Sequence, residues 1–396
     1  MGRSATFGGM IRVSERLDGN RVEFVVDAPA GGGQLWYEWG GAAIPTAATH
    51  LDVALVALTP TALRSGMDLA IDGEVDGALI EGVQEWADAW AYLRPDLFRP
   101  IRVGAEAQRT DPASAARRSG IIAFSGGVDS LYAASQHLTR SVAADPALVL
   151  VHGFDLPLDD PDGFATALQS AQVAADALGQ PLSWVRTNWR EDFSRHWTME
   201  FGAGLVSVLQ LWRTDAARAV LGSDEGSGYG FEVHPWGSNP ATNHLLGSAQ
   251  FPVVTHGFAA DRVGKCGVVA QRPELLDVVR VCLVEDAGGR NCGVCEKCLR
   301  TKLCFAAAGV RDVAAFDDQS LEALAALELH KPHLLEYFDA VLAHEPSHLR
   351  QDERSLVEDF LVRERRRLEP SIPRRAVRSA RYRGMRLVKR ARDLSG

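Results

Sequence analysis

Short apolar runs separated by glycine-rich and polar turns fill roughly the first hundred residues. Runs of this kind predict β-strands, which we expect at 11–13, 22–26, 34–37, 51–58 and 67–71. A helix follows, because apolar residues then recur at spacings of three and four, at Ile80, Val83, Ala87, Trp90 and Leu93. This helix should end before Pro95. Residues 1–105 are therefore predicted to form a small β-rich domain with one helix.

From about Ser119 the pattern changes to apolar runs that alternate with segments of helical periodicity. The expected strands are 121–124, 147–152, 182–187, 219–222 and 252–255. The expected helices are 129–139, 163–178, 200–217 and 259–269. This alternation predicts an α/β domain over residues 118–281, with a parallel sheet and helices on both faces. Ligands of such sheets bind at the carboxyl ends of the strands.

The first of these strands runs directly into a hexapeptide rich in glycine and hydroxyl groups: Ser125, Gly126, Gly127, Val128, Asp129 and Ser130. A turn between a strand and a helix gathers backbone N–H groups and the positive end of a helix dipole around one point, where phosphate is stabilised. A side chain at Gly126 or Gly127 would keep the backbone away from the anion, while Ser125 and Ser130 add hydroxyl donors. Phosphates would repel Asp129 unless a divalent cation lay between them, so we assign Asp129 a role in holding Mg²⁺.

The hexapeptide is not a Walker loop, because the chain contains no Gly-x-x-x-x-Gly-Lys-Ser/Thr. It resembles the Ser-Gly-Gly-x-Asp-Ser signature of the PP-loop ATP pyrophosphatases. The resemblance implies a fold of the adenine nucleotide α-hydrolase type and an enzyme that cuts ATP between its α- and β-phosphates. A structural glycine turn between a buried strand and a helix is the alternative interpretation.

Further candidates lie after later strands. The backbone at His152, Gly153 and Phe154 follows the second strand, which should lie beside the first, and we expect it to flank the adenine of bound ATP. Arg262 and Lys265 lie three residues apart on one face of a predicted helix. There they could neutralise phosphates or stabilise leaving pyrophosphate, or they could form an exposed polar helix face.

Four of the six cysteines have the spacing Cys-x9-Cys-x2-Cys-x2-Cys: Cys282, Cys292, Cys295 and Cys298. In a cytosolic chain such a cluster indicates metal binding rather than disulfides. Four thiolates satisfy the tetrahedral demand of Zn²⁺ and leave no open position, so the metal would be structural. An iron–sulfur cluster also accepts four thiolates, and spacing alone leaves that alternative open. The other two, Cys266 and Cys304, lie in apolar helical patterns and are expected to be buried.

Composition limits the class of protein. The chain has 396 residues, of which 46% are apolar, enough for a large core. It shows neither a membrane-spanning apolar run nor a signal-peptide core, so we expect a cytoplasmic protein. Its net charge of −9 is uneven, because residues 363–396 hold thirteen Arg or Lys against three acidic residues. Within this tail, 374–392 predicts a basic amphipathic helix that could meet a nucleic acid, an anionic membrane or the acidic body of the same protein, within one chain or in a dimer.

The hexapeptide and the cysteine cluster, in this order, make residues 119–301 similar to the 7-cyano-7-deazaguanine synthases of queuosine biosynthesis. The resemblance implies a zinc site after a PP-loop domain, and ATP-driven activation of a carboxylate that ammonia converts to an amide and then a nitrile. Lys265 and Cys282 fall where that family has a lysine-bearing helix and its first zinc ligand. The chain departs from the family at His152–Pro157, at Arg280-Val281, and in its extra N-terminal domain and basic tail. We therefore carry over ATP activation and zinc, and leave the substrate open.

We thus expect an enzyme that uses ATP and Mg²⁺ to adenylate a carboxylate or carbonyl oxygen of a small molecule, after which a nitrogen nucleophile displaces AMP. Asp129, Lys265 and Arg262 are the expected catalytic residues, acting through positioning and charge. A PP-loop sulfurtransferase acting on RNA and a catalytically silent nucleotide-binding partner protein are the alternatives. Residues 282–362 should hold the zinc site and a helical cap.

Overall fold

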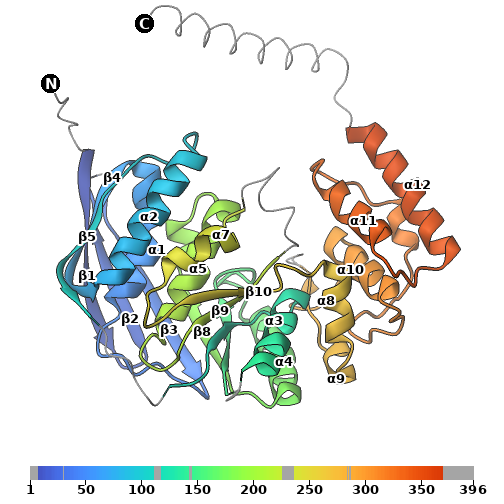
Figure 1. Cartoon of the computed structure of the whole chain (residues 1–396), viewed down its shortest axis with the longest axis horizontal. Coiled ribbons are helices and arrows are strands. Elements are labelled where there is room, and N and C mark those ends of the chain that lie inside the picture. Colours follow the sequence, from blue (N-terminus) through green and yellow to red (C-terminus); the bar gives the residue numbers. More distant parts are fainter. Residues whose placement is uncertain are drawn as a thin grey trace, which may run out of the picture.

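The protein forms a ten-stranded sheet with helices packed against it and a further group of helices at one end (Figure 1). The order of strands in the sheet is β10-β9-β6-β7-β8-β3-β2-β1-β4-β5. The structure is a computed structural model, and the residues it describes are 8–29, 31–110, 117–141, 145–224, 236–282, 284 and 287–368. The helix predicted at 374–392 lies outside them.

The N-terminal segment supplies half of the sheet. Its elements, in chain order, are β1 (Gly8–Asp18), β2 (Arg21–Asp27), β3 (Gly33–Gly41), α1 (Leu51–Ser65), β4 (Met67–Asp76), α2 (Gly77–Leu93) and β5 (Val103–Arg109). β1, β2 and β3 form an antiparallel meander, and β4 and β5 continue the sheet in parallel from β1. On β2, Val22, Phe24 and Val26 are buried against the helices, while the alternate residues are partly or fully exposed, so this part of the sheet has one solvent-facing side.

The strand predicted at 51–58 is wrong, because these residues belong to α1. The run is apolar at nearly every position, so it lacks the alternation that distinguishes a strand from a helix. In the structure every residue from Leu51 to Pro60 is buried, with α2, α5 and β4 packed around the helix. The N-terminal segment therefore contains two helices instead of one. β5 is an addition to the predicted strands.

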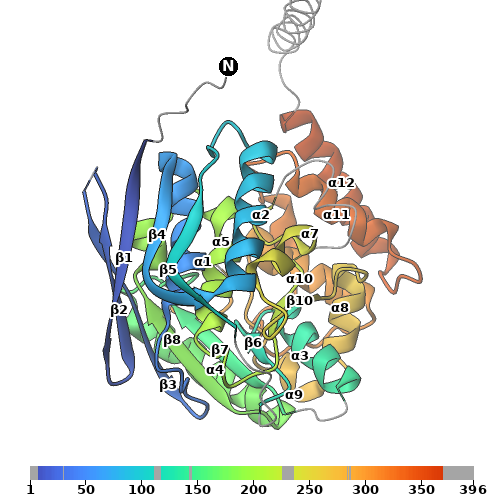
Figure 2. The ribbon, with the colours of Figure 1, turned by 60° about the vertical axis from the view of Figure 1, so that its left-hand side comes forward.

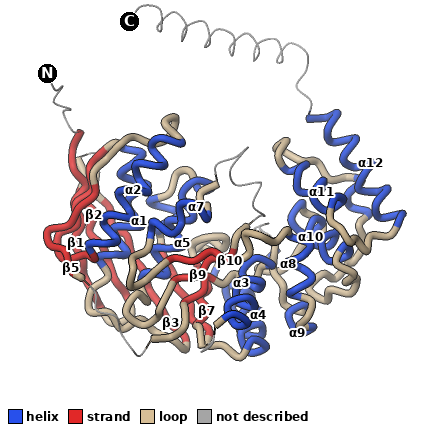
Figure 3. The backbone as a smooth tube through the Cα atoms, viewed as in Figure 1, coloured by secondary structure: helices blue, strands red, loops and turns tan. Residues whose placement is uncertain are grey.

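The second segment begins with β6, and the loop after it leads into α3. Its elements are β6 (Ile121–Ala123), α3 (Val128–Arg140), β7 (Ala147–His152), α4 (Pro161–Leu178), β8 (Leu182–Thr187), the π-helix η1 (Trp189–Phe193), α5 (Trp197–Gln210), β9 (Ala219–Gly222), α7 (Pro240–Asn243), the 3-10 helix η2 (His244–Leu246), β10 (Val253–His256), α8 (Arg262–Val269) and α9 (Pro273–Leu276). All five strands are parallel, as predicted. β8 pairs antiparallel with β3, so both segments share one sheet (Figure 3).

Helices cover both faces of the parallel half, as the continuous apolar strands predict. On β6, Ile121 and Ala123 face the core that contains α1, α2 and α5, whereas Ile122 faces a second core. The second core contains α3, α4 and α8. The parallel half is thus an α/β layer that positions the end of β6 between two groups of helices.

The helix that contains the last cysteine of the cluster and the helices after it extend the second core. They are α10 (Glu296–Ala307), α11 (Leu334–Ala343) and α12 (Gln351–Leu368), with the short 3-10 helix η4 (Glu322–Ala325) between α10 and α11. Figure 2 shows α10, α11 and α12 grouped together, away from β1 and β2. No helix in the described part of the chain has the length and apolar character required to cross a bilayer.

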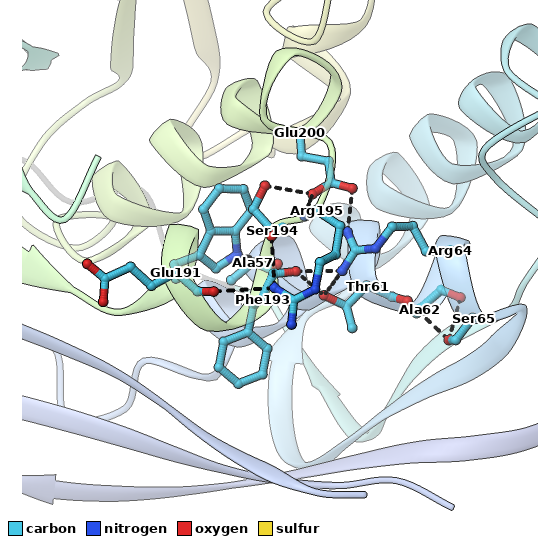
Figure 4. A network of polar contacts seen from close by, with 11 residues as sticks. Ala57, Thr61, Ala62, Arg64, Ser65, Glu191, Phe193, Ser194, Arg195 and Glu200 are labelled. Carbon is cyan, nitrogen blue, oxygen red and sulfur yellow. Dashed lines mark hydrogen bonds and ion pairs between the residues drawn. The ribbon is translucent and has the colours of Figure 1, made fainter. Parts of the chain in front are cut away.

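A buried polar network joins α1 to the chain after β8 (Figure 4). Arg64 of α1 forms an ion pair with Glu200 of α5, whose side chain is fully buried. Glu200 also accepts hydrogen bonds from the Ser194 hydroxyl at 2.8 Å and from the Arg195 backbone N–H at 3.0 Å. Trp189 donates its ring N–H to the Ala57 carbonyl oxygen at 2.7 Å. The network ties the N-terminal segment to the α/β layer through contacts far apart in sequence.

Candidate active site and metal centre

The predicted phosphate loop lies where the order of strands reverses. From β6 the chain proceeds to β7 and β8 on one side, and β9 and β10 then lie on the other side. In open α/β sheets, ligands bind outside the carboxyl ends of the strands at such a switch point. The hexapeptide 125–130 therefore has the location at which a parallel sheet accepts a ligand.

The conformation of this loop accounts for its glycines. Gly126 has a φ of +74°, in the left-handed region that favours glycine. Gly127 is the N-cap of α3, and no side chain among the described residues caps this helix. The Ser130 hydroxyl donates to the Gly127 carbonyl oxygen at 3.0 Å, and Ser125 accepts the Gly127 N–H at 3.3 Å. The first-turn N–H groups of α3 thus remain suited to an anion.

Asp129 brings together the two cations predicted from sequence. Its two carboxylate oxygens accept hydrogen bonds from Arg262 Nη1 at 2.8 Å and from Lys265 Nζ at 2.9 Å. Lys265 is fully buried, and the side chain of Asp129 is 20% exposed. Burial alone would raise the pKa of Asp129, but the charges of Arg262 and Lys265 outweigh it and hold this pKa below its ordinary value. Asp129 is therefore a carboxylate that orders two cations beside the loop 125–130.

Two further glycines allow the strand ends to converge: Gly257, expected near the site because it follows a predicted strand, and Gly222, which sequence reasoning missed. A Cβ on Gly222, at the end of β9, would lie 2.6 Å from the backbone oxygen of Asp129. A Cβ on Gly257, just after β10, would lie 3.2 Å from Cε of Lys265, and its φ is +93°. A glycine at the last position of a predicted strand is the sequence signal that could have found Gly222.

The segment after β7 lies next to the loop but turns its side chains inward. The His152 ring stacks on Phe164 at a centroid distance of 4.2 Å, and its Nε2 is 2.8 Å from the Pro157 carbonyl oxygen. Phe154 is buried against Trp189. Burial lowers the pKa of His152. The side chains of His152 and Phe154 therefore belong to the core, and the Gly153 N–H and the Phe154 carbonyl oxygen are bonded within the fold, to the Leu156 carbonyl oxygen and to Arg190.

The four clustered cysteines converge in space. Their sulfur atoms all lie within 4.8 Å of one another. Cys282 and Cys295 are 3.8 Å apart, and Cys292 and Cys298 are 3.9 Å apart. Four sulfurs bonded to zinc at about 2.3 Å in a tetrahedron would be about 3.8 Å apart. The cluster can therefore hold a metal such as zinc.

The pKa values of the clustered thiols diverge: burial raises the pKa of Cys282 and hydrogen bonding with Cys295 raises the pKa of Cys298, whereas Cys295 is favoured as the thiolate. Hydrogen bonds from Cys298, Cys292 and Cys282 outweigh burial and lower the pKa of Cys295 to about 5. Backbone N–H groups of Val284 and Cys295 donate to the sulfurs of Cys282 and Cys292 at 3.4 and 3.3 Å. Deprotonated sulfur is the form that binds a metal.

Asn291, which precedes the second cysteine, holds the segment that leads to the first. Its Oδ1 accepts the backbone N–H groups of Val281 and Cys282 at 2.9 and 3.2 Å, and its Nδ2 donates to the Val279 carbonyl oxygen at 2.8 Å. The same segment touches the loop 125–130, because the Arg280 N–H donates to the Gly126 carbonyl oxygen at 2.9 Å. The metal centre and the loop are therefore adjacent, which spacing alone did not reveal.

Three further residues near the cysteine cluster have structural positions. Cys266 and Cys304 are fully buried, as predicted, and burial raises the pKa of Cys266. Arg300 pairs with Glu296 at 2.9 Å and lies 4.0 Å from the centre of the Tyr337 ring, so it holds α11 against α10.

No protein-family model matches the chain, and no curated protein matches it by sequence.

Proposed function

We propose that the protein is an ATP-dependent adenylating enzyme that transfers AMP to a carboxylate or carbonyl oxygen of a small molecule and releases pyrophosphate. One observation carries this proposal: an uncapped helix N-terminus converges with Asp129, Arg262 and Lys265 at the switch point of the sheet. Backbone N–H groups suit phosphate, and the two cations suit the charge of leaving pyrophosphate. The resemblance of the hexapeptide to the PP-loop signature supports the same reaction.

In the proposed reaction, a substrate oxygen attacks the α-phosphorus of ATP. The bond from this phosphorus to the oxygen that bridges it to the β-phosphorus breaks, and pyrophosphate departs with the bonding electrons. A nitrogen nucleophile then attacks the activated carbon and AMP leaves. Arg262 and Lys265 stabilise the charge that develops on pyrophosphate, and Asp129 fixes both cations. Asp129 is also the residue that would hold Mg²⁺, because each carboxylate oxygen has a further lone pair.

For the cysteine cluster we propose a structural zinc ion. Four cysteines complete its shell, so no position remains for a reacting water or substrate. The ion would link Cys282 to α10 and so fix the segment that lies against the phosphate loop. Its binding free energy would contribute to folding.

The burial of Cys266 and Cys304 favours the adenylating enzyme over a sulfurtransferase that uses a cysteine as sulfur carrier. Such a carrier needs an accessible thiolate, and both thiols are fully buried. Replacing both cysteines by alanine should therefore leave pyrophosphate release intact.

Incubation with ATP, Mg²⁺ and pooled carboxylic acids tests the proposal. We expect AMP and pyrophosphate as products, and we expect Asp129→Asn to reduce their formation at least about a hundredfold, because the cations that stabilise the leaving group lose their anchor. Asp159→Asn, an exposed aspartate after β7, is the matched control and should retain activity. ADP as the product, or full activity of Asp129→Asn, would contradict the proposal. Binding of ATP without product formation in the presence of any of the pooled acids would favour the silent partner protein.

A further inference from the structure

Arg280 is a buried cation whose charge is left unmatched by the described part of the chain. Its side chain is 8% exposed, and its Nε has no hydrogen-bond partner among the described residues. Two other arginines of comparable burial each pair with a carboxylate: Arg213 with Asp52 at 2.7 Å and Arg300 with Glu296 at 2.9 Å. A buried charge without a partner is energetically costly, so an unpaired buried arginine indicates that an anionic ligand binds beside it.

The position of Arg280 points to the phosphate loop. Its backbone N–H donates to the Gly126 carbonyl oxygen at 2.9 Å, and its own carbonyl oxygen lies 3.3 Å from where a Cβ on Gly127 would be. The Arg280 Cβ itself lies 4.0 Å from where a Cβ on Gly126 would be. The side chain thus leaves the backbone beside the two glycines that open the N-terminus of α3. A buried arginine side chain therefore begins beside the first-turn N–H groups of α3.

One carboxylate acts on Arg280 from a distance. Asp155, exposed after β7, contributes to the electrostatic environment of the guanidinium, but the two residues form no ion pair within 4.0 Å. Asp155 can act in one of two ways. Its charge can repel an anion that binds Arg280, or Asp155 can itself be the partner of Arg280 through a water molecule. These two roles give opposite results when Asp155 is neutralised.

Building on the proposed function, we propose that Arg280 is a ligand of the pyrophosphate portion of the bound nucleotide, placed there by the segment that carries the first cysteine of the metal centre. Arginine presents a planar fork of donors that matches phosphate oxygens in a bidentate manner. Arg280 supplements Arg262 and Lys265 from a different segment of the chain. Arg262 and Lys265 belong to α8, whereas Arg280 lies between α9 and Cys282. It touches the leaving group and not the acceptor substrate.

Calorimetric titration of the full-length protein with inorganic pyrophosphate tests this assignment, with AMP as a second probe. Arg280→Gln should weaken pyrophosphate binding at least about tenfold, the loss expected for a charged hydrogen bond, and leave AMP binding nearly unchanged. Arg280→Lys should recover part of the affinity, because it restores charge without the fork. Arg290→Gln, an exposed arginine close to the same cysteines, is the matched control and should bind as wild type does. Metal content and the melting temperature verify that each variant is folded.

Asp155→Asn provides the second arm. If Arg280 binds the anion, this variant should bind pyrophosphate as tightly as wild type or more tightly. Unchanged pyrophosphate affinity in Arg280→Gln, or weaker binding in Asp155→Asn, would overturn the assignment while leaving the proposed function intact. Failure of the wild-type protein to bind either ATP or pyrophosphate would overturn both.

Discussion

At the scale of single residues, the site depends on a charge balance that one substitution disturbs. Lys265 is fully buried, and its ammonium donates hydrogen bonds to Asp129 and to the Ser223 carbonyl oxygen. We expect Asp129→Asn to destabilise the fold by about 3 kcal/mol, because it leaves a buried cation without its counter-charge. The double variant Asp129→Asn, Lys265→Met removes both charges and should recover most of that loss. Urea unfolding of the two variants measures this difference. If the double variant is no more stable than Asp129→Asn, the charges of Asp129 and Lys265 are not coupled.

His50 gives a second prediction at this scale, unrelated to the site. The ring lies 5.2 Å from the Trp39 ring in an edge-on contact, is 1% exposed, and neither nitrogen has a hydrogen-bond partner among the residues described. Burial, reinforced by the charge of Arg213 and opposed by Asp52 and Asp215, lowers the pKa of His50 to about 4.

The unfolded chain therefore binds this proton first as the pH falls. Stability should decrease between about pH 6.5, the ordinary pKa of histidine, and about pH 4, by up to about 3 kcal/mol, and this component should change little below that range. His50→Phe keeps the ring contact and removes the proton site, so its urea midpoint should fall less over the same pH interval. Parallel acid profiles of the two proteins would contradict the role of His50.

At the scale of elements, the parallel half of the sheet was predictable because apolar residues form continuous runs in its strands and recur every three or four residues in its helices. Apolar runs bounded by helical segments predicted β6 to β10 and the helices α3, α4, α5 and α8. The N-terminal error at 51–58 has a physical cause: a helix buried on all sides loses the polar stripe that identifies it. The hexapeptide and its two cations could be predicted from residue type. The contact between Arg280 and Gly126 could not, because it joins segments brought together only by the fold.

The contact between β9 and α3 gives the prediction at this scale. Gly222 lies so close to the start of α3 that a Cβ would meet the Asp129 backbone oxygen at 2.6 Å. Gly222→Ala should shift α3 away from the end of β9, destabilise the fold by about 1–3 kcal/mol, and weaken pyrophosphate binding. Gly104→Ala in β5 is the matched control, since no described atom lies within 4 Å of the position its Cβ would take and its φ is outside the left-handed range. Retention of both stability and binding in Gly222→Ala would show that α3 tolerates the displacement.

At the scale of the whole molecule, a single sheet joins the two segments that the sequence divides into domains. β3 pairs with β8 from Tyr37 opposite Thr187 to Gly41 opposite Ser183. The core on one face contains residues of both segments, including Leu55 of α1 and Val206 of α5. Because loss of either segment would expose this core, we expect both to unfold in one transition.

The ion pair between Arg64 of α1 and Glu200 of α5 joins the two segments, so its removal tests whether they unfold in one transition. Arg64→Ala leaves the fully buried Glu200 without its partner, so we expect a loss of about 3–5 kcal/mol in the free energy of unfolding. The apolar pair Arg64→Met, Glu200→Leu removes both charges and should be closer to wild type than Arg64→Ala. Far-ultraviolet circular dichroism and tryptophan fluorescence should give the same urea midpoint in each variant. Two separate transitions in Arg64→Ala would mean that the segments fold independently, in which case the shared sheet would be a docking surface rather than part of one cooperative core.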